Sequence, residues 1–235
     1  MEEVYKQTQE TMDEIKETVK EKEQKSQKFL LYIIGFIILI IAAFLITQNI
    51  SKESEFVTKD EMFNRVIKGD VDEANGYMYN GYAFVFDDIL KSWFTRIQID
   101  DELIEISLHF GPRDLENVTI YGSLDERFNQ KTIYLTFDPN STQMSYIAVS
   151  AAELSLNLAK GLNAIPVAAC TSNESACIDR PILTCDNTDK PVIYIKKDNR
   201  TAVMLDGNCV TLKGNEWGIT KAVDKFLLNW YRIMD

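Results

Sequence analysis

The chain has 235 residues and a formal net charge of −11 at pH 7. This excess of acidic residues argues against a nucleic-acid partner, because phosphates are bound by clustered Lys and Arg, and the C-terminal part has no basic stripe. Without a charged N-terminal tail and one apolar segment, roughly 165–185 residues remain, which is enough for one domain with a hydrophobic core.

The N-terminal region divides into a charged tail and an apolar segment. Residues 1–28 lack Gly and Pro and carry a thin apolar stripe, so we expect a solvated, partly helical tail. A short coiled coil or a docking helix is the alternative. Residues 29–50 contain no charged side chain, which predicts a transmembrane helix, since a span needs about 20 apolar residues. The preceding tail and the lack of a small-residue cleavage site favour a retained signal anchor.

The positive charges on either side of this segment predict its orientation. More Lys residues precede the segment than follow it, which places the N-terminus in the cytoplasm and the C-terminal domain outside it. The residues counted are Lys16, Lys20, Lys22, Lys25 and Lys28 before the segment, and Lys52, Lys59 and Arg65 after it.

Residues 51–70 form a predicted juxtamembrane linker and short helix. Thr58 and Glu61 have the spacing of a capping box, and Gly69 is a suitable C-cap. The helix has one apolar face, with which it would pack on the domain or lie at the membrane surface.

Residues 71–235 predict an extracytoplasmic α+β domain with a mixed sheet. Three segments rich in aromatic and β-branched residues indicate an antiparallel meander, and 118–121 adds a short strand. The meander strands are Tyr82–Phe86, Trp93–Ile99 and Leu103–Phe110.

The second half of this domain predicts a parallel crossover. Lys131–Phe137 reads as a strand, Thr142–Lys160 as a helix ended by Gly161, and Ile165–Ala169 as a second strand. Strand, helix and strand in this order predict a βαβ unit.

The C-terminal segment predicts one strand, a hairpin and a helix. Pro191–Lys196 is the strand, and Asp206-Gly207-Asn208 is a hairpin turn between Thr201–Leu205 and Cys209–Lys213. A helix is expected over Glu216–Met234.

All four cysteines lie in this domain. Their spacing lacks the paired knuckles of structural zinc and the C-x-x-C of redox sites, so we expect two disulfides and no metal. Four cysteines allow three pairings. We favour Cys170–Cys177, which closes a short loop, and Cys185–Cys209, which ties this loop to the hairpin.

Asn-x-Ser/Thr sequons support an exported domain when they are taken together with the anchor and the cysteines. They make candidate glycosylation sites of Asn117, Asn140, Asn173 and Asn199, and a further sequon, Asn49, lies in the apolar segment.

No catalytic, cofactor-binding or metal-binding residue can be assigned from motifs. His109 is the only histidine and is expected to pack at the rim of a sheet. Its alternative role is a general base near Arg113 and Asp114. The acidic turns at 87–88 and 100–102 are expected to be solvated turn formers.

Three stretches resemble segments of uncharacterised single-pass membrane proteins of small-genome archaea. They are HFGPRDLENV at 109–118, AAELSLNLAK at 151–160 and TCDNTDKPVIY at 184–194. The resemblance implies an exported, disulfide-bearing domain and carries no activity.

Three functions remain open. We favour a membrane-anchored binding or scaffold protein that lies in the lipid bilayer and contacts an envelope protein. The first alternative is an extracytoplasmic enzyme with a site near His109, Arg113 and Asp114. The second is a filament subunit similar to type IV pilins. Those pilins usually have Gly before the cleavage site and Glu at the fifth mature position, where this chain has Lys28 and Ile33.

Overall fold

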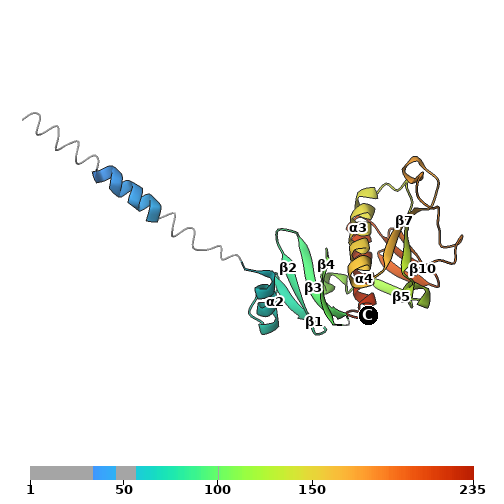
Figure 1. The fold of residues 1–235 in the computed structure, drawn as a ribbon, viewed down its shortest axis with the longest axis horizontal. Helices are drawn as coiled ribbons and strands as arrows, with labels where there is room; N and C mark the ends of the chain where they lie inside the picture. Colours follow the sequence, from blue (N-terminus) through green and yellow to red (C-terminus); the bar gives the residue numbers. More distant parts are fainter. Residues whose placement is uncertain (1–33, 46–56, 100) are drawn as a thin grey trace, which may run out of the picture. The chain divides into compact units, whose positions relative to one another are not determined.

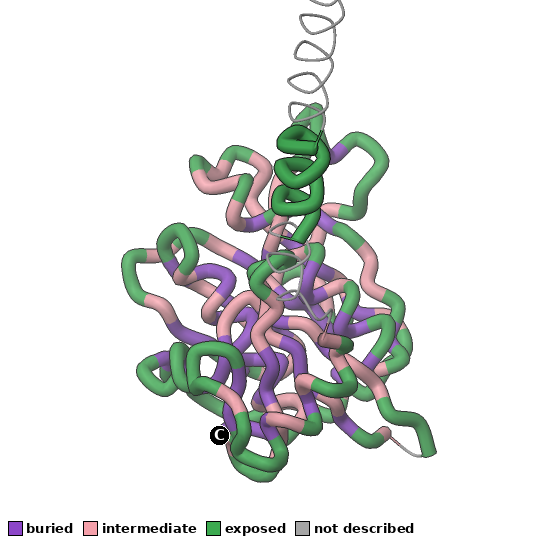
Figure 2. The backbone as a smooth tube through the Cα atoms, turned by 90° about the vertical axis from the view of Figure 1, so that its left-hand side faces the viewer, coloured by how far each residue is buried: buried purple, intermediate pink, exposed green. Residues whose placement is uncertain are grey.

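The computed structural model describes residues 34–45, 57–99 and 101–235, and the chain divides into two compact units, Met1–Phe56 and Val57–Asp235. In the first unit, residues 34–45 are helical and exposed along their length (Figure 2). Within the described ranges, no helix combines the length and apolar character needed to cross a bilayer. The predicted tail and both ends of the predicted span, 29–33 and 46–50, lie outside these ranges.

The second unit begins with helix α2 (Lys59–Lys68), as the sequence predicts. The Thr58 hydroxyl accepts a hydrogen bond from the backbone N–H of Glu61, and Gly69 ends the helix at φ 71°. The helix packs on a sheet through a small apolar cluster made of Phe63, Val66, Val85 and Phe94.

That sheet is antiparallel and has four strands in the order β1-β2-β3-β4. The strands are β1 (Gly76–Tyr79), β2 (Tyr82–Asp87), β3 (Ser92–Ile99) and β4 (Glu102–Leu108). The predicted meander is confirmed, and β1 is an additional strand that pairs with β2.

The second sheet is mixed and has six strands in the order β5-β9-β10-β8-β6-β7. Its strands are β5 (Thr119–Gly122), β6 (Thr132–Phe137), β7 (Ile165–Cys170), β8 (Val192–Lys197), β9 (Ala202–Asp206) and β10 (Cys209–Gly214). The parallel pair β6–β7 confirms the predicted crossover, and the antiparallel pair β9–β10 confirms the hairpin.

The prediction of a single mixed sheet is wrong, because the strands divide between two sheets. Helices α3 (Met144–Gly161) and α4 (Trp217–Trp230) lie between them, so the layers run from α2 through the four-stranded sheet and the two helices to the six-stranded sheet (Figure 1). The main core joins all three inner layers, from Phe84 through Leu154 and Phe226 to Ile193. The last helix ends at Trp230, four residues before the predicted Met234.

Short 3₁₀ turns complete the architecture. They are η2 (Pro112–Leu115), η3 (Glu126–Asn129) and η4 (Ser175–Cys177). Strand β4 ends at Leu108, and Gly111 directly precedes η2.

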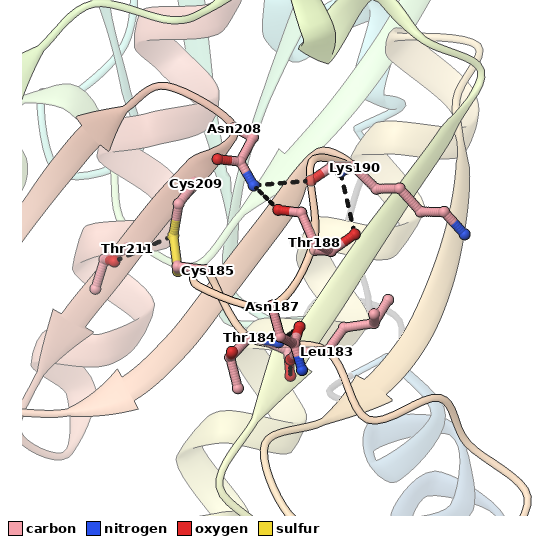
Figure 3. The surroundings of a disulfide bond; sticks show 10 residues. Leu183, Thr184, Cys185, Asn187, Thr188, Lys190, Asn208, Cys209 and Thr211 are labelled. Atoms are coloured by element: carbon pink, nitrogen blue, oxygen red, sulfur yellow. Dashed lines mark hydrogen bonds between the residues drawn. A yellow bond between two sulfur atoms is a disulfide. The ribbon is translucent and has the colours of Figure 1, made fainter.

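An irregular loop over residues 171–191 covers part of the outer face of the six-stranded sheet, where a crossover would normally place a helix. The predicted disulfides are confirmed: Cys170–Cys177 closes the start of the loop, and Cys185–Cys209 fastens it to β10 (Figure 3). The Thr136 hydroxyl also donates to the Leu183 carbonyl at 2.7 Å. The loop, which takes the place of a helix, is therefore held to the sheet by a disulfide and a hydrogen bond.

Gly161 has a packing role instead of the predicted C-cap role. It is the last residue of α3, and a Cβ there would lie 2.1 Å from the Tyr231 hydroxyl oxygen. We expect Gly161→Ala to lower the free energy of unfolding by about 1–3 kcal/mol, although Ala is the better helix former. Denaturant titration of the variant measures this, and Tyr231→Phe should recover part of the loss. A Gly161→Ala variant as stable as the native chain would contradict this packing.

Candidate functional site

Helix α2 leaves part of the four-stranded sheet uncovered. Ten helical residues extend about 15 Å, whereas the eight residues of β3 extend about 26 Å. A helix this short covers only one end of the strands. The outer face near the other end is open to solvent.

A hollow of about 390 Å³ occupies this open part, and we call it the sheet hollow. Three exposed apolar side chains surround it: Ile67 is 63% exposed, Leu103 61% and Met78 44%. The residues that line it are Phe63, Asn64, Ile67, Met78, Gly81, Tyr82, Ala83, Arg96, Gln98 and Leu103.

The register of the strands explains why these side chains meet. Met78 pairs with Ala83, and Gln98 pairs with Leu103, so all four lie on the face that α2 only partly covers. Side chains alternate between the faces of a sheet, so their neighbours along each strand point to the main core.

Ion pairs join α2 to the strands beside the hollow. Arg96 donates to Asp60 at 2.5 Å, and its guanidinium lies 4.2 Å from the centre of the Phe63 ring. Lys59 binds Glu105 at 2.8 Å and lies over the Phe94 ring at 3.4 Å. These contacts fix both the helix and the rim of the hollow. Its lining is mainly apolar, with the amides of Asn64 and Gln98, the phenol of Tyr82 and the guanidinium of Arg96, which suits binding.

A second polar cluster surrounds His109, which follows β4. The Nδ1 atom of His109 contacts the Glu153 carboxylate, and the backbone N–H of His109 donates to Glu153 Oε1 at 3.3 Å. The backbone N–H of Phe110 donates to Asp224 Oδ2 at 2.8 Å. Glu153 and Asp224, which we call the acid pair, lie on α3 and α4 and are buried.

The two carboxyl groups of the acid pair are neighbours in a dry environment, which favours a proton on Asp224. Burial, and then the Glu153 carboxylate, raise the pKa of Asp224 well above its usual range. With both groups ionised, Asp224 Oδ1 has no hydrogen-bond partner within the described residues. A proton on Asp224 supplies the missing donor toward Glu153. The hydrogen bond that the His109 ring donates to the Glu153 carboxylate in turn raises the pKa of His109 above its ordinary value.

The hydrogen bonds of the described residues do not connect the three residues of the alternative catalytic site with one another. Arg113 donates to Glu73 at 2.9 Å and stacks 4.1 Å from the Tyr77 ring, and Asp114 is exposed. His109 instead has Trp217 beside it, with ring centres 5.7 Å apart. The acid pair joins the segment that follows β4 to α3 and α4, so it ties the four-stranded sheet to the layer of helices.

The other predicted residues lie at the surface. The asparagines of the four predicted glycosylation sites are exposed, and Asn49 is outside the described ranges. The Asp87 carboxylate accepts from the backbone N–H groups of Ile89 and Leu90, as a turn former does. No group of three or more His, Cys, Asp or Glu residues suited to a metal occurs in the described parts of the chain.

Comparison with known proteins identified no relative of this chain. A scan against protein-family models and searches of curated proteins and of solved structures found no match. The resemblance to archaeal single-pass membrane proteins stays a prediction.

Proposed function

We propose that this chain is a membrane-anchored binding or scaffold protein of the cell envelope, with a cytoplasmic N-terminus and an extracytoplasmic domain that binds an envelope protein. The observation that carries the proposal is the sheet hollow, a concave apolar surface bordered by Ile67, Leu103 and Met78. Exposed apolar side chains that gather around a hollow favour an interaction site, because leaving them in water has a cost that binding removes.

Two features support the anchor and the compartment. Residues 29–50 carry no charge and follow a Lys-rich segment, which is typical of a signal anchor with its N-terminus inside. Both disulfides lie in the C-terminal domain, and such bonds persist in oxidising compartments outside the cytoplasm.

A protein fits the sheet hollow better than a lipid surface does. A membrane surface is contacted by protruding apolar side chains, whereas this site is concave and receives a side chain. We therefore infer a partner that inserts apolar side chains between α2 and the sheet.

Photo-crosslinking from position 103 of the full chain, in native membranes, tests this proposal. We expect a discrete adduct with another protein from position 103 and none from position 89. Ile89 is 88% exposed in the turn between β2 and β3, so it is a matched site on the same sheet. Met78→Asp should lower the yield of the adduct about tenfold or more, the loss expected for an anchor worth about 1.4 kcal/mol.

Ile89→Asp is the control, because it makes the same kind of change away from the hollow. Equal unfolding temperatures of the two variants show that both are folded. Adducts with lipid alone, with a second copy of this chain alone, or unaffected by Met78→Asp would each refute the proposed partner site.

The two alternatives remain predictions. An enzyme that uses His109 would work with the acid pair, because His109 contacts Glu153, whereas Arg113 pairs with Glu73 and Asp114 is exposed. The pilin-like alternative depends on Lys28 and Ile33, which lie outside the described ranges.

A further inference from the structure

The four sequons of the C-terminal domain lie far apart in the sequence but at the same edge of the six-stranded sheet. Strands β6, β7 and β8 are parallel, so their carboxyl ends share one edge. Asn140 is the third residue after β6, Asn173 the third after β7, and Asn199 the second after β8.

Asn117 reaches this edge from the opposite direction. It lies two residues before β5, which runs antiparallel to β8. The register connects the two ends directly: Thr119 pairs with Ala202, Ala202 with Lys213, and Lys213 with Lys196. The start of β5 and the end of β8 therefore lie in one row across the sheet.

The local structure at these sites suits modification of the asparagine. All four asparagines are exposed and lie in turns or loops, outside the strands. Asn140 Nδ2 donates to Glu174 Oε1 at 3.2 Å, which places the loop after β6 beside the loop after β7. The third residue of each sequon, Thr119, Thr142, Ser175 or Thr201, supplies the required hydroxyl.

We propose that this edge of the six-stranded sheet is a glycan-bearing face, modified at Asn117, Asn140, Asn173 and Asn199. In each transfer the side-chain nitrogen of the asparagine forms a bond to the anomeric carbon of a sugar, and the proton that it loses passes to the solvent. The bond between that carbon and the phosphate oxygen of a lipid-linked oligosaccharide breaks, and the lipid phosphate leaves. No oxidant or reductant is involved.

Glycans at this edge leave the proposed partner site open. The sheet hollow belongs to the four-stranded sheet, and α3 and α4 separate that sheet from the six-stranded one (Figure 1). A second hollow of about 380 Å³, between β6 and β8, is bordered by Asn140 and would be screened. The sugars would thus keep other proteins away from this edge of the six-stranded sheet, while the sheet hollow on the four-stranded sheet stays open to a partner.

Mass spectrometry of glycopeptides from the full chain, extracted from its native membranes, tests the inference. Sugar on three or four of the asparagines is the expected result, and sugar on two or fewer would overturn it. Thr119→Ala should abolish the modification of Asn117, whereas Thr119→Ser, which keeps the hydroxyl, should retain it. Loss in both variants, or in neither, would contradict a sequon mechanism.

This result is separable from that of the proposed function. A chain with intact disulfides and bare asparagines would remain an exported binding domain without a glycan face. Sugar at these sites in a chain that yields no adduct from position 103 would leave the inference standing and remove the partner.

Discussion

Replacing Asp224 by Asn is expected to reduce the loss of stability that this buried carboxyl group should cause as the pH rises above its unfolded pKa. Asp224 is fully buried, and its pKa is raised well above the ordinary value. The folded chain therefore holds a proton that the unfolded chain releases, so stability falls as the pH rises above the unfolded pKa of the group. An amide at this position keeps a donor toward Glu153 and an acceptor for the N–H of Phe110, without a proton to lose.

His109 acts in the same direction. Its pKa is raised by its bond to Glu153, so its contribution is complete below the unfolded pKa and is lost as the pH rises through the folded one. At pH 8 we expect Asp224→Asn to be more stable than the native chain by about 1–3 kcal/mol, the usual cost of a buried polar group without its partner. Near pH 3, below the unfolded pKa of the group, the two should be nearly equal.

Denaturant titration at the two pH values measures this effect, with the exposed Asp206→Asn as control. Because His109 is the only histidine, its NMR titration is an independent reading. Glu153→Gln should lower the pKa of His109, since the carboxylate that raises it is gone while the burial remains. Equal pH profiles for Asp224→Asn and the native chain would show that the acid pair holds no proton.

Removing the Cys185–Cys209 bridge is the second change with a large expected effect. The bridge closes a loop with a sequence separation of 24 and fastens segment 171–191 to β10. We expect Cys185→Ser with Cys209→Ser to lower the free energy of unfolding by about 2–4 kcal/mol, mainly because the unfolded chain gains freedom.

The two disulfides should not be equivalent. Cys170–Cys177 has a sequence separation of only 7, so its loss should cost less in the same account. Without the second bridge, the Asn208 amide, which donates to the carbonyls of Thr188 and Lys190, would still hold the loop (Figure 3). Denaturant titration compares the free energy of unfolding of this double variant with that of Cys170→Ser with Cys177→Ser. Equal stabilities of the Cys185/Cys209 variant and the native chain would mean that the loop is held without the bridge.

Local signals in the sequence predicted much of the fold. The capping residues of α2, the turn at Gly207 and the β6–α3–β7 crossover depend on neighbours in sequence or on one connection, and the structure confirms them. The pairing of the cysteines followed from the same logic, since one pair is close in sequence and the other joins a loop to a predicted hairpin.

Strand β1 was missed although a signal for it was present. Asn80 and Gly81 have φ values of 45° and 86°, and Asn-Gly is the strongest short hairpin signal. The four residues of β1 are too few to show alternation, so the turn alone could have identified the strand.

The division into two sheets and the sheet hollow were beyond local patterns. They depend on how α3 and α4 insert between distant strands, and on the length of α2 relative to β3. The sequence gives only a weak indication of the acid pair. Glu153 and Asp224 adjoin the apolar positions Leu154 and Val223 of two helices. A lone acid beside an apolar stripe is usually at the edge of the helix surface, so only the packing reveals that these two meet.

The claim on which this account rests is that the C-terminal domain is held outside the cytoplasm. Intact-mass measurement of the full chain, extracted from membranes and alkylated without and with reductant, tests it most directly. The account predicts no alkyl adduct before reduction and four after it, one for each cysteine. Four adducts before reduction would place the cysteines in a reducing compartment and contradict the proposed orientation.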